Sequence, residues 1–122
     1  MSIPTSGIVH IEIPAPDLKK ATAFYSSVFS WKVDDSFPSS GGEQYAMFQD
    51  GAVGGGFDPR LKPTTDGIVL YIAVKDIPEA LKKIAASGGS VIKEKTEIGG
   101  NHGYYALFKD PNGNKVGIWC KM

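Results

Sequence analysis

An internal repeat limits the folds open to this chain more than any other feature of its sequence. The segment Tyr45-Ala46-Met47-Phe48-Gln49-Asp50 returns sixty positions later as Tyr105-Ala106-Leu107-Phe108-Lys109-Asp110, with four of the six residues identical. At the same offset, Gly7-Ile8-Val9 returns as Gly67-Ile68-Val69. A repeat of this kind indicates one structural unit used twice. We therefore expect a duplicated fold.

Each half of the chain predicts the same opening, a strand followed by a helix. In residues 8–13, Val9, Ile11 and Ile13 alternate with Ile8, His10 and Glu12, which predicts a strand with an apolar face toward the helices and a second face that carries polar groups. Asp17 is placed to cap a helix over residues 18–29. The second half predicts a strand over 68–74 and a helix to about residue 86 that Asp76 caps.

Shorter strands are predicted after each helix, over residues 31–33, 44–49 and 52–57 and again over 90–95, 104–109 and 115–120. Each half is then a βαβββ unit, about 7–57 and 67–120. Strands that share one crossover helix per unit indicate an α+β fold. We expect one domain, residues 1–122, in which the two units form a curved mixed sheet with helices on one face and a concave pocket on the other.

Composition excludes several classes of partner. Thirteen basic residues balance thirteen acidic ones in the 122-residue chain, so no net charge attracts nucleic acid or an anionic membrane. The sequence has no apolar run of the length that spans a bilayer, and we expect no export signal. Cys120 is the only cysteine, which leaves no disulfide framework. We expect a cytoplasmic protein without nucleic acid or membrane partners.

Two stretches resemble a known family. The opening Val9-His10-Ile11-Glu12-Ile13, leading to Ala23-Phe24-Tyr25, and the closing Phe108-Lys109-Asp110-Pro111-Asn112-Gly113-Asn114 are similar to the vicinal oxygen chelate superfamily of glyoxalases, bleomycin-resistance proteins and dioxygenases. The chain is most similar to the glyoxalase-like proteins related to lactoylglutathione lyase. This resemblance implies a glyoxalase-like fold, and fold alone does not fix a reaction.

The resemblance also implies where a metal would bind. Metal-dependent relatives use four side chains on the concave face, and His10 matches the first of these positions. The matching positions hold Val69, Gly117 and a glycine at about Gly54 or Gly55, none of which offers a side-chain ligand. One imidazole is too few for a stable zinc, nickel or iron site. We therefore expect no metal and no other cofactor.

A different metal site remains an alternative, built from His10, Glu12 and His102. Without a metal, the alternation places Ile8, His10 and Glu12 in the pocket together with Val69, Tyr71 and Ala73. His10 is the predicted general base or acid, with Glu12, Tyr71 or His102 assisting. In the simpler alternative, His10 is an inherited pocket residue that is hydrogen-bonded to Glu12 or Tyr71 and does no chemistry. The predicted ligand contacts are Tyr71, Val69 and Trp119.

Three functions fit this pattern. The first is a metal-independent lyase or isomerase that acts on a small oxygenated metabolite through His10, and the second is a protein of the bleomycin-resistance type that sequesters a toxin or aromatic metabolite. The third, a metal-dependent lactoylglutathione lyase, is disfavoured by the missing ligands. In the first two cases we expect a small-molecule ligand, a homodimer, and a buried His10 and Glu12 that satisfy each other.

Overall fold

The computed structural model describes residues 6, 8–38, 44–51 and 53–122 and divides the chain into two compact units, Met1–Lys62 and Pro63–Met122. The first unit contains β1 (His10–Pro14), α1 (Leu18–Phe29), β2 (Lys32–Pro38), β3 (Gln44–Gln49) and β4 (Gly54–Asp58). The second contains β5 (Tyr71–Ala73), α2 (Ile77–Ala86), β6 (Ser90–Glu97), β7 (Tyr104–Lys109) and β8 (Lys115–Cys120).

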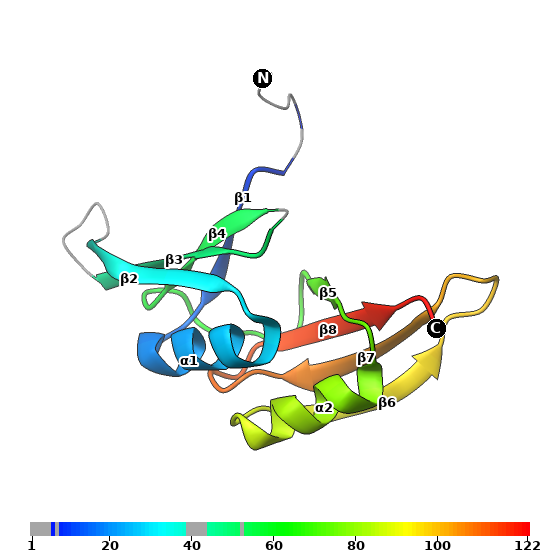
Figure 1. Cartoon of the computed structure of the whole chain (residues 1–122). Coiled ribbons are helices and arrows are strands. Elements are labelled where there is room, and N and C mark those ends of the chain that lie inside the picture. The colour runs from blue at the N-terminus through cyan, green and yellow to red at the C-terminus, as the bar shows by residue number, and fades with distance from the viewer. Residues whose placement is uncertain (1–5, 7, 39–43, 52) are drawn as a thin grey trace. The chain divides into compact units, whose positions relative to one another are not determined.

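The two units share one topology. The strand order is β1-β4-β3-β2 in the first sheet and β5-β8-β7-β6 in the second. In each sheet the first and last strands of the unit pair in parallel and the other pairs are antiparallel. Each helix lies along one side of its own sheet, as Figure 1 shows. The predicted α+β class with two βαβββ units is confirmed.

The helices begin where the sequence predicts. The Asp17 carboxylate accepts a hydrogen bond from the Lys20 amide at 3.0 Å, and the Asp76 carboxylate accepts one from the Glu79 amide at 2.9 Å. Each bond satisfies an amide that the first turn of a helix leaves without a backbone partner. The helix that follows each cap then covers one face of the sheet in its unit.

Apolar side chains between helix and sheet form the core of each unit. In the first unit the core is aromatic: Trp31 stacks on Tyr25 with 4.8 Å between ring centroids and on Phe48 with 4.6 Å. In the second unit the core is mainly aliphatic, and its buried residues are Ile77, Ala80, Leu81, Ile84, Ala106, Phe108, Val116, Ile118 and Cys120. Because both cores lie on the helix side, the other face of each sheet is left for polar or aromatic side chains.

The ends of several predicted strands are wrong. The strand expected over residues 8–13 is β1, which begins at His10, and the one expected over 68–74 is β5, Tyr71–Ala73. Val9, predicted to face the helix, lies before β1 and is 61% exposed. A strand begins only where its backbone pairs with a neighbour, and β4 and β8 pair with the first strands from these points on. Among the described residues, none of the helices has both the length and the apolar character needed to span a bilayer.

Candidate functional site

The face of the first sheet opposite α1 carries the polar side chains of β1. Ile13 is buried and Ile11 is half-buried, whereas His10 and Glu12 are exposed. This alternation follows from the two-residue period of a strand. The predicted placement of His10 and Glu12 on one face is therefore confirmed by their exposure, but the prediction that they are buried is wrong.

A tyrosine of β3 joins these two side chains. The Tyr45 hydroxyl donates a hydrogen bond to Glu12 Oε2 at 2.9 Å and lies 3.0 Å from His10 Nε2. A carboxylate only accepts hydrogen bonds, so the single hydroxyl proton of Tyr45 goes to Glu12. His10 Nε2 must then carry the proton of its own bond to Tyr45, and in the neutral imidazole Nδ1 is left as an acceptor.

A glycine in β4 allows Tyr45 to reach β1. Strand β4 lies between β3 and β1, and Gly56 pairs with Glu12 on one side and with Met47 on the other. A Cβ atom at Gly56 would lie only 1.9 Å from the Tyr45 hydroxyl oxygen and 2.0 Å from Cζ. Only a residue without a side chain leaves the space that the Tyr45 ring occupies above β4.

Burial raises the pKa of Tyr45 to about 12, with further contributions from its hydrogen bond to Glu12 and the charges of Glu12 and Asp58. Each of these disfavours the phenolate. Asp58 is itself buried at the end of β4, and the Arg60 guanidinium that binds it in a salt bridge at 2.9 Å lowers the pKa of its carboxyl. Tyr45 therefore remains a neutral hydrogen-bonding group at physiological pH.

The open face of the second sheet is aromatic. The Tyr71 ring of β5 lies over Gly117 of β8, where a Cβ atom would be 2.4 Å from it, and its centroid is 6.2 Å from that of Tyr105. Lys93 Nζ lies 5.5 Å from the centroid of the Tyr105 ring. Tyr71 is 53% exposed. This face offers stacking surfaces and a cation.

The remaining predicted residues also lie in the second unit. Trp119 is half-buried, and its indole nitrogen donates to the backbone carbonyl of His102 at 2.8 Å. His102 is exposed in the turn before β7, and Val69 is half-buried just before β5. The structure thus connects His10 to Glu12 through the Tyr45 hydroxyl, and Trp119 to His102 through a hydrogen bond to its backbone. The grouping of His10 and Glu12 with Tyr71, Val69, Trp119 and His102 stays a prediction.

Tyr45 is the site residue that sequence reasoning missed. The alternation in β3 places Ala46 and Phe48 in the core, and this leaves Tyr45 on the open face. The glycines of β4 are the other indication, because a glycine strand next to β1 gives room for a long side chain from β3. Neither pattern by itself shows that the ring crosses β4.

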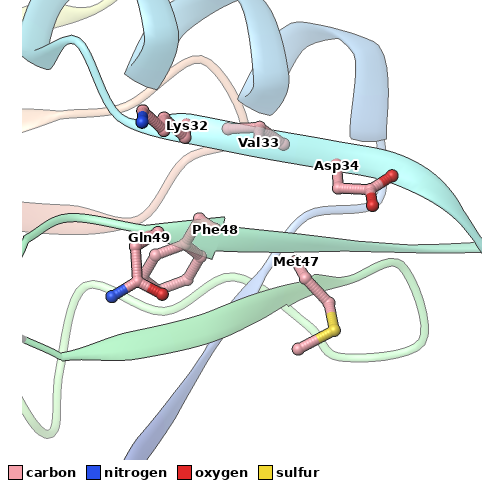
Figure 2. Close-up of a pocket in the computed structure, with 6 residues that line it drawn as sticks. All are labelled: Lys32, Val33, Asp34, Met47, Phe48 and Gln49. Carbon is pink, nitrogen blue, oxygen red and sulfur yellow. The ribbon is translucent and has the colours of Figure 1, made fainter.

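An open hollow of about 280 Å³ lies over β2 and β3 of the first unit (Figure 2). It was not predicted. Its lining comes from two neighbouring strands and consists of Lys32, Val33, Asp34, Met47, Phe48 and Gln49. Figure 2 shows Lys32 and Gln49 at one end and Asp34 and Met47 at the other, in agreement with their cross-strand pairing.

The fold and site define a class, an α+β protein of two βαβββ units in which the first unit carries a His–Tyr–Glu cluster on its open sheet face. Residues 7–118 match the model of the Glyoxalase/Bleomycin resistance protein/Dioxygenase superfamily, and the chain belongs to this superfamily. The predicted family is thereby confirmed.

The chain is similar to a putative glyoxylase, a fosfomycin resistance protein and an antibiotic-binding protein. The chain is 30% identical over 114 residues to the putative glyoxylase CFP32 of Mycobacterium bovis, covering 89% of this chain but only 43% of that protein, so it spans less than half the length of this relative. One similar structure is the fosfomycin resistance protein FosX of Listeria monocytogenes, which was solved with Mn(II) and 1S,2S-dihydroxypropylphosphonic acid. It superposes with a TM-score of 0.76 at 18% identity, and the match covers 95% of this chain and 90% of the FosX chain. The antibiotic-binding protein TnmS3 of Streptomyces strain CB03234 has a TM-score of 0.72 at 18% identity and 98% coverage of both chains. At 18% identity, the comparison with these two structures shows a shared fold and nothing more.

The residues of this chain do not fit the metal of the metal-dependent relatives. Gly54 pairs directly with His10 on the open face, and Gly117 pairs with Tyr71, so neither strand supplies a ligand there. The protonated Tyr45 hydroxyl lies between His10 and Glu12, where an ion bound by both would have to sit. Within the described part of the chain, no three His, Cys, Asp or Glu side chains are grouped closely enough to hold an ion.

Proposed function

We propose that this glyoxalase-like protein is a lyase or isomerase that acts on a small oxygenated metabolite by proton transfer at His10, without a metal. The observation that supports it is the hydrogen-bonded chain from His10 Nε2 through the Tyr45 hydroxyl to Glu12. It orients one imidazole on an exposed face and connects it to a carboxylate. This is the arrangement that general acid and base catalysis requires.

The proton transfer uses His10 Nδ1. In neutral His10 this nitrogen accepts the proton of a carbon next to a substrate carbonyl. The electron pair of the broken C–H bond forms a carbon–carbon double bond, and the π pair of the carbonyl moves to its oxygen. The imidazolium that forms keeps the hydrogen bond from its Nε2–H group to the Tyr45 hydroxyl. Return of the Nδ1 proton to another atom completes an isomerisation. Tyr45 and Glu12 are positioning residues in this scheme.

The proposal also gives roles to residues of the second unit. We assign ligand contacts to Tyr71, Val69 and Trp119, because they offer aromatic and apolar surface beside an exposed sheet face. His102 is proposed to assist from the turn before β7. The protein is proposed to work in the cytoplasm, where the buried free thiol of Cys120 remains reduced.

The experiment follows deuterium incorporation by NMR into hydroxyacetone dissolved in D₂O. We expect His10→Ala to slow the protein-dependent exchange by roughly 10²-fold or more. Tyr45→Phe and Glu12→Gln should slow it less, because the imidazole remains. Glu94→Gln, which changes an exposed carboxylate of β6, is the matched control and should exchange like the parent. Equal exchange in the parent and His10→Ala would refute the catalytic assignment.

A second candidate function is sequestration of an aromatic compound, as in a bleomycin-resistance protein. The exposed Tyr71 ring and its neighbour Tyr105 favour it, since planar ligands stack on such surfaces. In this case Tyr71→Ala weakens binding of the ligand while His10→Ala has little effect. The two variants therefore separate the two functions.

We also propose that the protein forms a homodimer, since two-fold pairing is the commonest closed assembly. The chain has a mass of 13.0 kDa. Light scattering at tens of micromolar should therefore give twice this mass. A value that remains at the mass of one chain would contradict the dimer.

A further inference from the structure

The open face of the second sheet gathers aromatic, apolar and basic side chains. Tyr71 of β5 pairs with Gly117 of β8. Gly117 pairs in turn with Leu107 of β7, and Leu107 pairs with Lys93 of β6. This line crosses the sheet from one edge strand to the other (Figure 1). Phe108, the next residue of β7, is buried in the core, so the alternation of a strand places Leu107 and its partners on the face opposite α2.

Two side chains turn inward over this line from its ends. The ring of Tyr71, an exposed residue, lies over Gly117, and Lys93 Nζ lies 5.5 Å from the centroid of the Tyr105 ring. The Tyr71 and Tyr105 rings are 6.2 Å apart between centroids, and their planes meet at 65°. A planar ligand stacked on one ring therefore meets the other edge-on. These are the two arrangements that aromatic rings prefer.

The charges on this face favour an anion. Of the described residues that strand pairing places there, three are lysines and none is an aspartate or glutamate. Lys109 and Lys115 pair directly across β7 and β8, where like charges repel each other. Lys93 forms no ion pair with a described carboxylate. The open face of the first sheet, by contrast, carries Glu12 and Asp34. A negatively charged ligand therefore suits the second face.

We propose that this aromatic face, formed by Tyr71, Tyr105, Leu107 and Lys93, binds a planar aromatic carboxylate. The ring of the ligand contacts the two tyrosine rings, and its acid group accepts a hydrogen bond from the Lys93 ammonium. Half-buried Leu107 lies between the Tyr71 and Lys93 ends of the line and gives an apolar floor. This inference rests on the second candidate function, the sequestration of an aromatic compound, and deepens it by naming the charge of the ligand.

The probes are 2-naphthoate and its neutral analogue 2-naphthamide. In NMR titrations of the labelled full chain, we expect 2-naphthoate to shift the amide signals of Tyr71, Tyr105 and Lys93 and to bind about tenfold more tightly than 2-naphthamide. Lys93→Met removes the charge, so it should weaken 2-naphthoate binding by about the same factor and leave 2-naphthamide binding unchanged. Lys95→Met is the matched control, because Lys95 Nζ lies over the ring of Tyr104, whose side chain points to the other face of β7. It should bind both probes like the parent.

A second pair of variants tests the ring. Tyr71→Leu keeps an apolar side chain but loses the ring, and it should weaken binding of both probes by about fivefold. Tyr71→Phe keeps the ring and should bind both probes like the parent. Shifts confined to other residues, or an unchanged affinity for 2-naphthoate in Lys93→Met, would overturn the inference. Equal affinity for both probes that falls in Tyr71→Leu would also overturn it, but would leave the sequestration of an aromatic compound standing.

Discussion

Tyr45 is the residue on which the proposed chemistry depends most closely. Its hydroxyl bonds two side chains that lie two positions apart on another strand, and it does so across an intervening strand. The hydroxyl lies between the His10 imidazole and the Glu12 carboxylate, in the position that a metal ion bound by both side chains would occupy. Its high pKa keeps it in the protonated form that this role requires.

Replacing Tyr45 by Phe should change how stability depends on pH in alkali. The pKa of Tyr45 is about 12 in the folded protein against 10.0 for an ordinary tyrosine. Its stabilising contribution is therefore complete below pH 10 and is lost as the pH rises from about 10 to 12, because the unfolded chain ionises first. Urea unfolding at pH 9 and pH 11 should show a larger loss in the parent than in Tyr45→Phe.

Glu12→Gln refines the same measurement. It removes the charge of Glu12 but leaves burial, the largest cause of the raised pKa. We expect its loss of stability between pH 9 and pH 11 to lie between those of the parent and Tyr45→Phe. The same loss in all three proteins would mean that Tyr45 ionises normally in the fold.

At the scale of the element, the three glycines of β4 have different tasks. Gly56 leaves space for the Tyr45 ring, and Gly54, between His10 and Gln49, has the Gln49 amide oxygen 3.4 Å from where a Cβ would be. At Gly55 a side chain would face the helix side of the sheet. Its Cβ would lie 2.0 Å from the Ile11 carbonyl oxygen and 2.5 Å from Phe48 Cζ. The strand therefore serves both the core and the site.

Gly55→Ala should destabilise the protein strongly. The added methyl group must move either the backbone of β1 or a buried aromatic ring, and such overpacking costs about 1–3 kcal/mol. Gly54→Ala is the matched control, because its methyl group makes ordinary van der Waals contact with Gln49 Oε1 at 3.4 Å and the Phe48 carbonyl oxygen at 3.5 Å. It should change the free energy of unfolding by less than about 1 kcal/mol. Urea denaturation at neutral pH measures both. Losses of the same size would show that β1 and Phe48 adapt freely.

At the scale of the whole molecule, one topology is used twice with different chemistry. The open face of the first unit carries His10, Glu12 and Tyr45, and the open face of the second carries Tyr71 and Tyr105. In both units a glycine of the last strand accommodates a tyrosine ring, but the ring comes from β3 in one and from β5 in the other. Duplication thus preserved the backbone while the two faces diverged.

The same divergence leads to a prediction about metal content. Because Gly54, Gly117 and Val69 offer no ligand and Tyr45 fills the space between His10 and Glu12, we expect elemental analysis of purified protein to find far less than one zinc, nickel, manganese or iron per chain. Treatment with EDTA should leave the melting temperature unchanged. One tightly bound ion per chain, with a melting temperature that falls on chelation, would contradict this and restore the metal-dependent alternative.

The sequence alone determined the family, the α+β class and the order of elements, because repeats, two-residue alternation and helix caps are local patterns. It also determined that His10 and Glu12 share a face. The strand ends at His10 and Tyr71 were decided by pairing with β4 and β8, which is a property of the sheet. The hydrogen bonds of Tyr45 with His10 and with Glu12 were likewise decided by the tertiary structure. They depend on the order β1-β4-β3-β2 and its register, which place residues more than thirty positions apart side by side.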